Sequence, residues 1–185
     1  MGSVKKGFTF LELVVVIMLI GLLATIVVPN LQNVIPGYKR KEFLSRLTGL
    51  VRLSWQQALI TQRAHRVLFD LEKRIVQVEI ESEKKDKKAK PLFEPIKISY
   101  LNSTYQWTEN IEIKQFFVEG KELIARPGIK TEQVWFYIAP DGLAQEVIIN
   151  FVDTAQLDAG RPTTISLVLN PFSAQFREYD TFQKP

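Results

Sequence analysis

The stretch Lys5-Lys6-Gly7-Phe8-Thr9-Phe10-Leu11-Glu12 opens an apolar run that continues to Val28, and this run decides how the rest of the chain is organised. Residues 8–28 have about the length that a helix needs to cross a bilayer. One carboxylate, that of Glu12, lies inside the run, and a charge in hydrocarbon costs roughly 2.5–3.5 kcal/mol. The sequence therefore predicts a membrane helix whose acid needs a partner of opposite charge.

A partner for Glu12 arises if the chain is cut after Gly7. The new N-terminus at Phe8 would carry an ammonium group, which can pair with the Glu12 carboxylate of a neighbouring copy. At a separation of about 4 Å, two unit charges attract by roughly 4 kcal/mol at an effective dielectric constant near 20. This attraction is comparable to the cost of burying the acid, so the pair would favour assembly and set the axial register between subunits.

The hexapeptide from Gly7 to Glu12 resembles the cleavage and methylation signature of type IV prepilins and type II secretion pseudopilins. The resemblance implies that a prepilin peptidase removes a leader, residues 1–7, and N-methylates Phe8. It also implies that Glu12 helps to dock the subunit into a filament. The alternative is an ordinary signal anchor in which Glu12 is accidental.

Composition limits the chemistry that the chain can perform. The 185 residues include no cysteine and one histidine, His65, which leaves little for a zinc site, a thiol nucleophile or a catalytic triad. His65 is predicted at the surface, on the edge of a strand. The scattered acids Asp141, Asp153 and Asp158 do not have calcium-loop spacing. We expect no catalytic site, no metal and no cofactor, and thus no enzyme.

The distribution of charge indicates how the chain is oriented in the membrane and gives little indication of a charged ligand. The net charge is +4, and two of these charges, Lys5 and Lys6, belong to the leader, so nucleic-acid binding is not expected. These lysines directly flank the apolar run, although residues 39–41 are also basic. We place the N-terminus in the cytoplasm of a bacterium and the C-terminal domain in the periplasm, with a single pass through the inner membrane; the resemblance implies the same topology.

The segment 29–62 is predicted to continue the helix. Pro29 interrupts the run but the helical period resumes at once, so a kink is expected there, and a second kink or short interruption is expected at Pro36-Gly37. From Tyr38 to Gln62 the helix is amphipathic and should pack on a sheet. Its predicted apolar stripe contains Phe43, Leu44, Leu47, Leu50, Val51, Ala58 and Leu59.

Residues 63–185 are predicted to form a body of antiparallel strands. The expected strands are His65–Leu71, Arg74–Glu81, Ile96–Tyr100, Tyr105–Trp107, Ile111–Val118, Val134–Ala139, Glu146–Val152, Thr163–Leu169 and Ala174–Tyr179. Turns at Glu72-Lys73, Pro140-Asp141-Gly142 and Asn170–Ser173 should each join a hairpin. The lysine-rich segment Lys84–Lys90 is expected to be a solvated loop, with a nucleic-acid or lipid-headgroup patch as the alternative.

A long helix followed only by strands resembles the H-type minor pseudopilins of type II secretion, with matching pieces at Phe136–Gly142 and Ile165–Leu169. The resemblance implies an α+β, pilin-like fold and a structural role at or near the tip of a periplasmic pseudopilus that helps to export folded proteins across the outer membrane. Implied partners are the prepilin peptidase, the major and other minor pseudopilins, the inner-membrane assembly platform and secreted cargo. A minor type IV pilin, acting in pilus assembly or DNA uptake, is the alternative, and an anchored periplasmic enzyme is a third.

Overall fold

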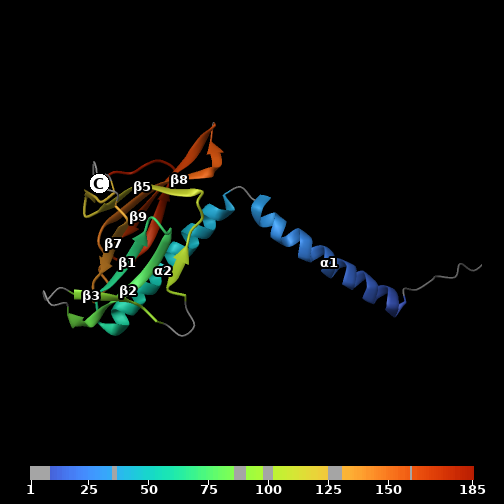
Figure 1. The fold of residues 1–185 in the computed structure, drawn as a ribbon, viewed down its shortest axis with the longest axis horizontal. Helices are drawn as coiled ribbons and strands as arrows, with labels where there is room; N and C mark the ends of the chain where they lie inside the picture. The colour runs from blue at the N-terminus through green and yellow to red at the C-terminus, as the bar shows by residue number, and fades with distance from the viewer. Residues whose placement is uncertain (1–8, 35–36, 86–90, 98–101, 125–130, 159) are drawn as a thin grey trace, which may run out of the picture. The chain divides into compact units, whose positions relative to one another are not determined.

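The computed structural model describes residues 9–34, 37–85, 91–97, 102–124, 131–158 and 160–185 (Figure 1). The chain divides into two compact units, Met1–Tyr38 and Lys39–Pro185. The first contains helix α1, Phe10–Val34, and the second contains helix α2 apart from its first residue, together with the described strands. The predicted order of helix and then antiparallel strands, an α+β fold, is confirmed.

Helix α1 continues through Pro29 and ends at Val34. Proline in a helix removes one backbone hydrogen bond, but in an otherwise helical sequence the flanking turns can retain their geometry. The expected kink at Pro36 falls on a residue outside the described part of the chain. The next helix begins at Tyr38, directly after Gly37, which has a left-handed φ of 70° that glycine adopts without strain.

Helix α2, Tyr38–Thr61, buries one face in the body, as its 3.6-residue period predicted. Of the predicted stripe, Leu44 and Leu59 are only partly buried, and Ser54 joins the buried face. The helix ends one residue earlier than predicted because Gln62 has a φ of 52°, a left-handed conformation typical of helix ends. The buried residues of α2 are Phe43, Leu47, Leu50, Val51, Ser54 and Ala58.

The first sheet has the order β3-β2-β1-β7, with β4 also pairing with β2. Its strands are β1 His65–Asp70, β2 Ile75–Lys85, β3 Pro91–Pro95, β4 Thr104–Gln106 and β7 Gln133–Ile138. The predicted hairpin around Glu72-Lys73 is confirmed, since Asp70 faces Ile75. Strand β3 occupies Pro91–Pro95, where no strand was predicted; its two prolines are tolerated because β3 is an edge strand. The predicted strand Ile96–Tyr100 is wrong at Ile96 and Lys97, and the remainder lies outside the described residues.

The second sheet has the order β10-β9-β8-β5-β6. Its strands are β5 Ile111–Val118, β6 Lys121–Glu122, β8 Val147–Asp158, β9 Arg161–Asn170 and β10 Gln175–Tyr179. The hairpin of β9 and β10 around Asn170–Ser173 is confirmed. In Figure 1 the β8–β9 hairpin extends beyond the ends of the neighbouring strands.

The predicted hairpin across Pro140-Asp141-Gly142 is wrong. Strand β7 pairs with β1, and β8 pairs with β5 and β9, so this turn carries the chain from the first sheet to the second. The turn packs on the end of α2: a Cβ at Gly142 would lie 3.0 Å from side-chain atoms of Trp55 and Leu59. Gly142 has a φ of 84°, so the glycine meets both a conformational and a spatial requirement.

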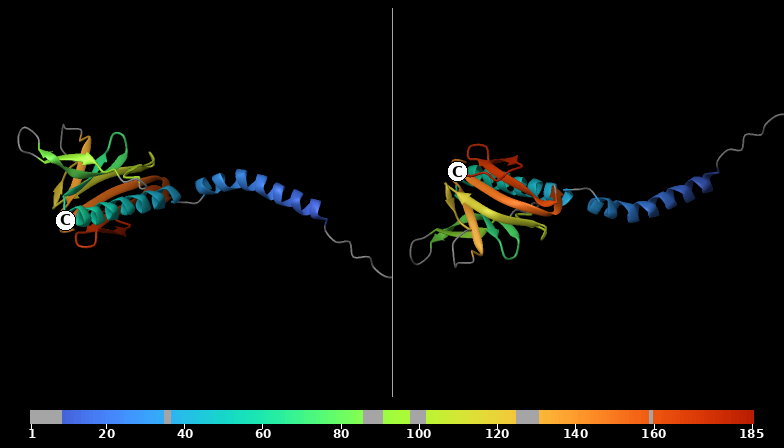
Figure 2. Two further views of the ribbon diagram at one scale, coloured as in Figure 1. Left: turned by 90° about the horizontal axis from the view of Figure 1, so that it is seen from below. Right: turned by 90° about the horizontal axis from the view of Figure 1, so that it is seen from above.

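One hydrophobic core joins α2 to both sheets (Figure 2). Phe43 of α2 is at its centre: its ring centroid lies 5.4 Å from that of Phe151 in β8 and 5.9 Å from that of Trp107. Phe69 of β1 contacts Phe116 of β5 with a centroid separation of 5.0 Å. Because aromatic side chains bury large apolar areas, these contacts hold the three layers together.

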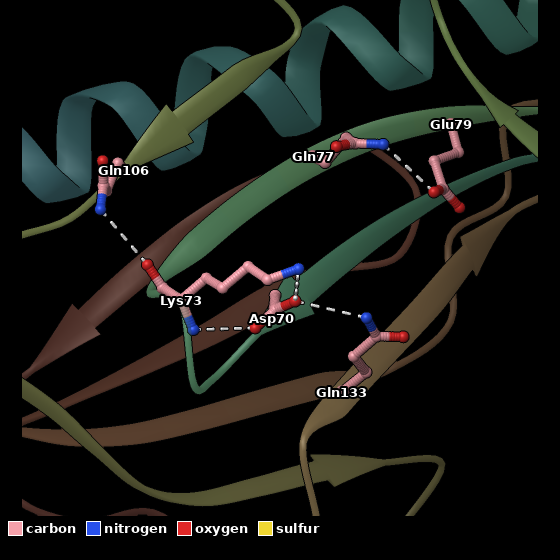
Figure 3. Close-up of polar contacts among 6 residues, drawn as sticks. All are labelled: Asp70, Lys73, Gln77, Glu79, Gln106 and Gln133. Atoms are coloured by element: carbon pink, nitrogen blue, oxygen red, sulfur yellow. Dashed lines mark hydrogen bonds and ion pairs between the residues drawn. The ribbon is translucent and has the colours of Figure 1, made fainter.

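The β1–β2 turn is closed by the carboxylate of Asp70 (Figure 3). Its Oδ1 accepts a hydrogen bond from the Lys73 backbone N–H at 2.8 Å, and its Oδ2 accepts one from Gln133 Nε2 at 3.3 Å. The Lys73 ammonium lies 3.6 Å from Oδ2. The backbone hydrogen bond from Lys73 lowers the pKa of Asp70 below its usual value.

Asp70→Ala should lower the free energy of unfolding by about 1 kcal/mol, since it removes the hydrogen bonds to the turn and to β7. Lys73→Ala is the matched control, because it keeps the backbone N–H and loses only an exposed ion pair worth about 0–1 kcal/mol. Urea unfolding of the full chain in a non-ionic detergent measures both. Equal effects of the two variants would show that the carboxylate's hydrogen bonds do not stabilise the turn.

Candidate functional site

The candidate site begins at the first turn of α1. Thr9 Oγ1 accepts a hydrogen bond from the Glu12 backbone N–H at 3.3 Å, and the Thr9 carbonyl accepts one from Leu13 N–H at 3.2 Å. Thr9 is therefore the N-cap of α1 and Glu12 its third helical residue, where a negative side chain is favoured. Sequence reasoning missed this cap, although a threonine three residues before a glutamate is a recognisable signal.

The predicted cleavage residues Gly7 and Phe8 lie outside the described residues. Glu12 is exposed, and no side chain of residues 9–25 forms a hydrogen bond or ion pair with its carboxylate. The acid therefore lies among the apolar residues of α1 without a side-chain partner in residues 9–25.

The described side chains of α1 are exposed on every side of the helix. Phe10 is 83% exposed and Ile20 is 60% exposed. A helix that is apolar all round is stable only in apolar surroundings. Within the described residues, no helix combines the length and the hydropathy needed to span a membrane. The large exposed apolar residues of α1 are Phe10, Leu11, Leu13, Val14, Val15, Val16, Ile17, Met18, Leu19, Ile20, Leu22 and Leu23.

The acids considered for metal binding have structural contacts. Asp141 Oδ1 accepts a hydrogen bond from Leu143 N–H at 3.0 Å, and Asp153 Oδ1 accepts one from Ala155 N–H at 3.0 Å. Asp158 faces Arg161 at the tip of the β8–β9 hairpin. In the described ranges no three His, Cys, Asp or Glu residues are grouped so that they can hold a metal ion.

His65 is buried, so the prediction that it lies on the surface is wrong. It is the first residue of β1, which lies between β2 and β7 in the first sheet. Its Nδ1 lies 2.9 Å from the Arg63 carbonyl, which can only accept, so Nδ1 carries the proton. Its Nε2 is buried without a hydrogen-bond partner in the described chain. Burial lowers the pKa of His65.

The lowered pKa of His65 predicts a loss of stability in mild acid. The unfolded chain takes up a proton near pH 6.5 and the folded chain only at lower pH, so the free energy of unfolding should fall as pH falls below about 6.5. The slope should not exceed about 1.4 kcal/mol per pH unit for this one proton. Unfolding of the full chain in detergent between pH 7.5 and pH 5 measures it.

His65→Asn keeps an N–H donor near the position of Nδ1 for the Arg63 carbonyl but does not titrate. We expect the pH dependence between pH 7.5 and pH 5 to flatten in this variant. An unchanged slope would mean that another group titrates in this window.

The N-terminal segment is similar to known proteins. Residues 2–28 match the prokaryotic N-terminal methylation motif. Two type IV major fimbrial proteins FimA of Dichelobacter nodosus are each 38% identical to the chain over 60 residues, or 32% of this chain. The chain spans 38% and 37% of the length of these two relatives.

The body resembles a solved structure. The minor pseudopilin EpsH from the Type 2 Secretion System of Vibrio cholerae matches with a TM-score of 0.53 and 9% identity, over 80% of this chain and 99% of that one. At 9% identity, the similarity shows a shared fold only. The N-terminal segment thus carries the prokaryotic N-terminal methylation motif and is similar to type IV fimbrial proteins, and the chain is similar in fold to a minor pseudopilin.

Proposed function

We propose that the chain is an H-type minor pseudopilin, a structural subunit of a type II secretion pseudopilus and not an enzyme. The observation that carries this proposal is the methylation motif at residues 2–28 in a chain whose fold matches the minor pseudopilin EpsH. The subunit would act by joining a filament near its tip, and that filament would help to export folded proteins across the outer membrane.

Processing of the N-terminus prepares the subunit for assembly. A prepilin peptidase cuts between Gly7 and Phe8 and methylates the new amino group. The segment 8–28 then anchors the subunit in the inner membrane with its body, residues 63–185, in the periplasm. The exposed apolar surface of α1 supports this anchor, because such a surface is costly in water.

Docking uses the charge of Glu12. No side chain of residues 9–25 pairs with its carboxylate, and the ammonium of a neighbouring subunit's first residue would supply a partner. The segment 29–62, with Pro29 and Pro36, connects the anchor to the body and allows it to bend. The other pseudopilins, the assembly platform and the cargo are the partners that this role requires.

The test is co-purification of the full-length chain, extracted in non-ionic detergent, with the other minor pseudopilins of the same organism. A stable complex with them, and none with minor type IV pilins of that organism, is the expected result. The absence of any complex with pseudopilins would contradict the assignment.

A second candidate, a minor type IV pilin, is favoured only by the similarity to fimbrial proteins over 60 residues. If it were correct, loss of the gene would abolish surface pili while protein secretion remained normal. We expect the opposite phenotype.

A further inference from the structure

A groove lined by both polar and apolar residues runs along one side of α2. It has a volume of about 610 Å³, and its lining includes Arg46, Gly49, Arg52 and Gln56 of α2 together with Thr104 and Tyr105 of β4. Figure 3 shows β4, labelled at Gln106, beside the helix. The lining of α2 runs from Ser45 to Gln56, which corresponds to roughly 16 Å along a helix axis. The groove is therefore about three helical turns long.

The groove is lined by two arginines that form no direct ion pair within the described residues. Helix α2 has five basic residues and one acidic residue, Glu42, whose carboxylate lies 3.7 Å from the Lys39 ammonium. Arg46 and Arg52 are exposed, and no carboxylate of a described residue lies within 4.0 Å of either guanidinium. Both side chains line the same groove, so a ligand there meets two arginines that can each bind a carboxylate in a bidentate manner.

The floor of the groove permits close approach. A Cβ added at Gly49 would have no atom within 4 Å. Beside it, the partly buried Leu53 and Tyr105 supply apolar surface. If a second α-helix lay along α2, its backbone could approach the α2 backbone closely at Gly49. Its carboxylates would then lie near Arg46 and Arg52.

We propose that this groove docks an acidic helix of a neighbouring protein subunit. The identity of that neighbour, a second pseudopilin, rests on the proposed function. The chemistry of the contact does not depend on it. Nucleic acid fits less well, since only two cations line the groove, and phosphate chains are bound by larger sets of cations. Beyond the Glu12 contact, the groove would provide a second, charge-selective contact between subunits.

The experiment uses the full-length chain in a non-ionic detergent and a fluorescent, alanine-based helical peptide with glutamate at every fourth position. An otherwise identical peptide with glutamine is the control ligand. Fluorescence anisotropy should give a Kd at least about fivefold lower for the glutamate peptide, as expected for a pair of exposed charge contacts. The preference should shrink as salt rises, because exposed charges are screened.

Two pairs of variants test where the peptide binds. Arg46→Glu combined with Arg52→Glu should abolish the preference, while Arg177→Glu, an exposed arginine of β10, should leave it intact. Gly49→Trp should fill the groove and weaken binding, while Gly49→Ala should not, since a Cβ fits there. Equal binding of the two peptides, or unchanged binding by the double arginine variant, would overturn the proposal.

Two further ligands are a 20-nucleotide DNA and phosphatidylglycerol vesicles. The proposal would also be overturned if either bound more tightly than the glutamate peptide and lost that binding in the double arginine variant. The assay contains no secretion components, so its failure would leave the co-purification test of the proposed function unaffected. Conversely, a peptide-binding groove in a chain that joins no pseudopilins would refute only the function.

Discussion

The Glu12→Val variant should be cleaved normally after Gly7 and yet be almost absent from filaments. Replacing the acid removes a charge that costs roughly 2.5–3.5 kcal/mol in hydrocarbon, so membrane insertion should be at least as good as in the wild type. What the variant loses is the ion pair with the N-terminal ammonium of a neighbour, for which we estimate an attraction of roughly 4 kcal/mol. The measurement is the amount of this subunit in sheared filaments or crosslinked tip complexes, relative to its amount in the membrane.

Glu12→Gln separates charge from shape. It keeps the length of the side chain and removes only its charge, so its incorporation should fall as in Glu12→Val. Normal incorporation of either variant, with a correctly processed Phe8 terminus, would contradict the docking role. Glu12 belongs to the compact unit Met1–Tyr38 and the body to the unit Lys39–Pro185, so the thermal stability of the body should not change.

Phe43→Ala should have the largest effect on folding, lowering the free energy of unfolding by about 3–5 kcal/mol. The ring is fully buried and joins α2 to the second sheet through Phe151, so its removal leaves a cavity that the surrounding strands cannot fill. A loss of this size is a large part of the 5–15 kcal/mol that stabilises a typical domain.

Ile60→Ala is the control for Phe43→Ala. Ile60 is on the same helix but is 73% exposed, and we expect a change within about 0.5 kcal/mol. Chemical denaturation of both full-length variants in detergent provides the comparison. A similar small loss for the two variants would show that Phe43 does not link the helix to the sheets.

The elements that depend on local pattern were predictable from the sequence. The apolar period of α2, the alternation in β1 and β2, and the turn residues at Asn170–Ser173 each gave the observed element within a few residues. These signals are local because each arises from residues that contact one another within one helix or one hairpin.

The pairing of distant strands was not predictable in this way. Pro140-Asp141-Gly142 forms a turn, but a turn shows only that the chain changes direction and does not show which strands pair. Strand β7, which precedes this turn, pairs with β1. The burial of His65 is equally non-local, since it lies in a strand that is flanked by β2 and β7 and packed within the fold. The pairing and the burial both depend on tertiary contacts.

The candidate site was only partly predictable as well. Glu12 and its apolar surroundings can be identified from the sequence, whereas the groove of Arg46 and Arg52 depends on β4, which is more than 50 residues away in the chain. On the sequence alone, both arginines are part of the ordinary polar face of an amphipathic helix.

The most direct test of the account is the N-terminus of the wild-type chain, determined by mass spectrometry in cells with and without the prepilin peptidase. We predict a mature chain that begins with N-methylated Phe8 when the peptidase is present, and an intact leader, residues 1–7, when it is absent. A chain that retains its leader in both strains, or that begins at any residue other than Phe8, would contradict its assignment as a processed filament subunit.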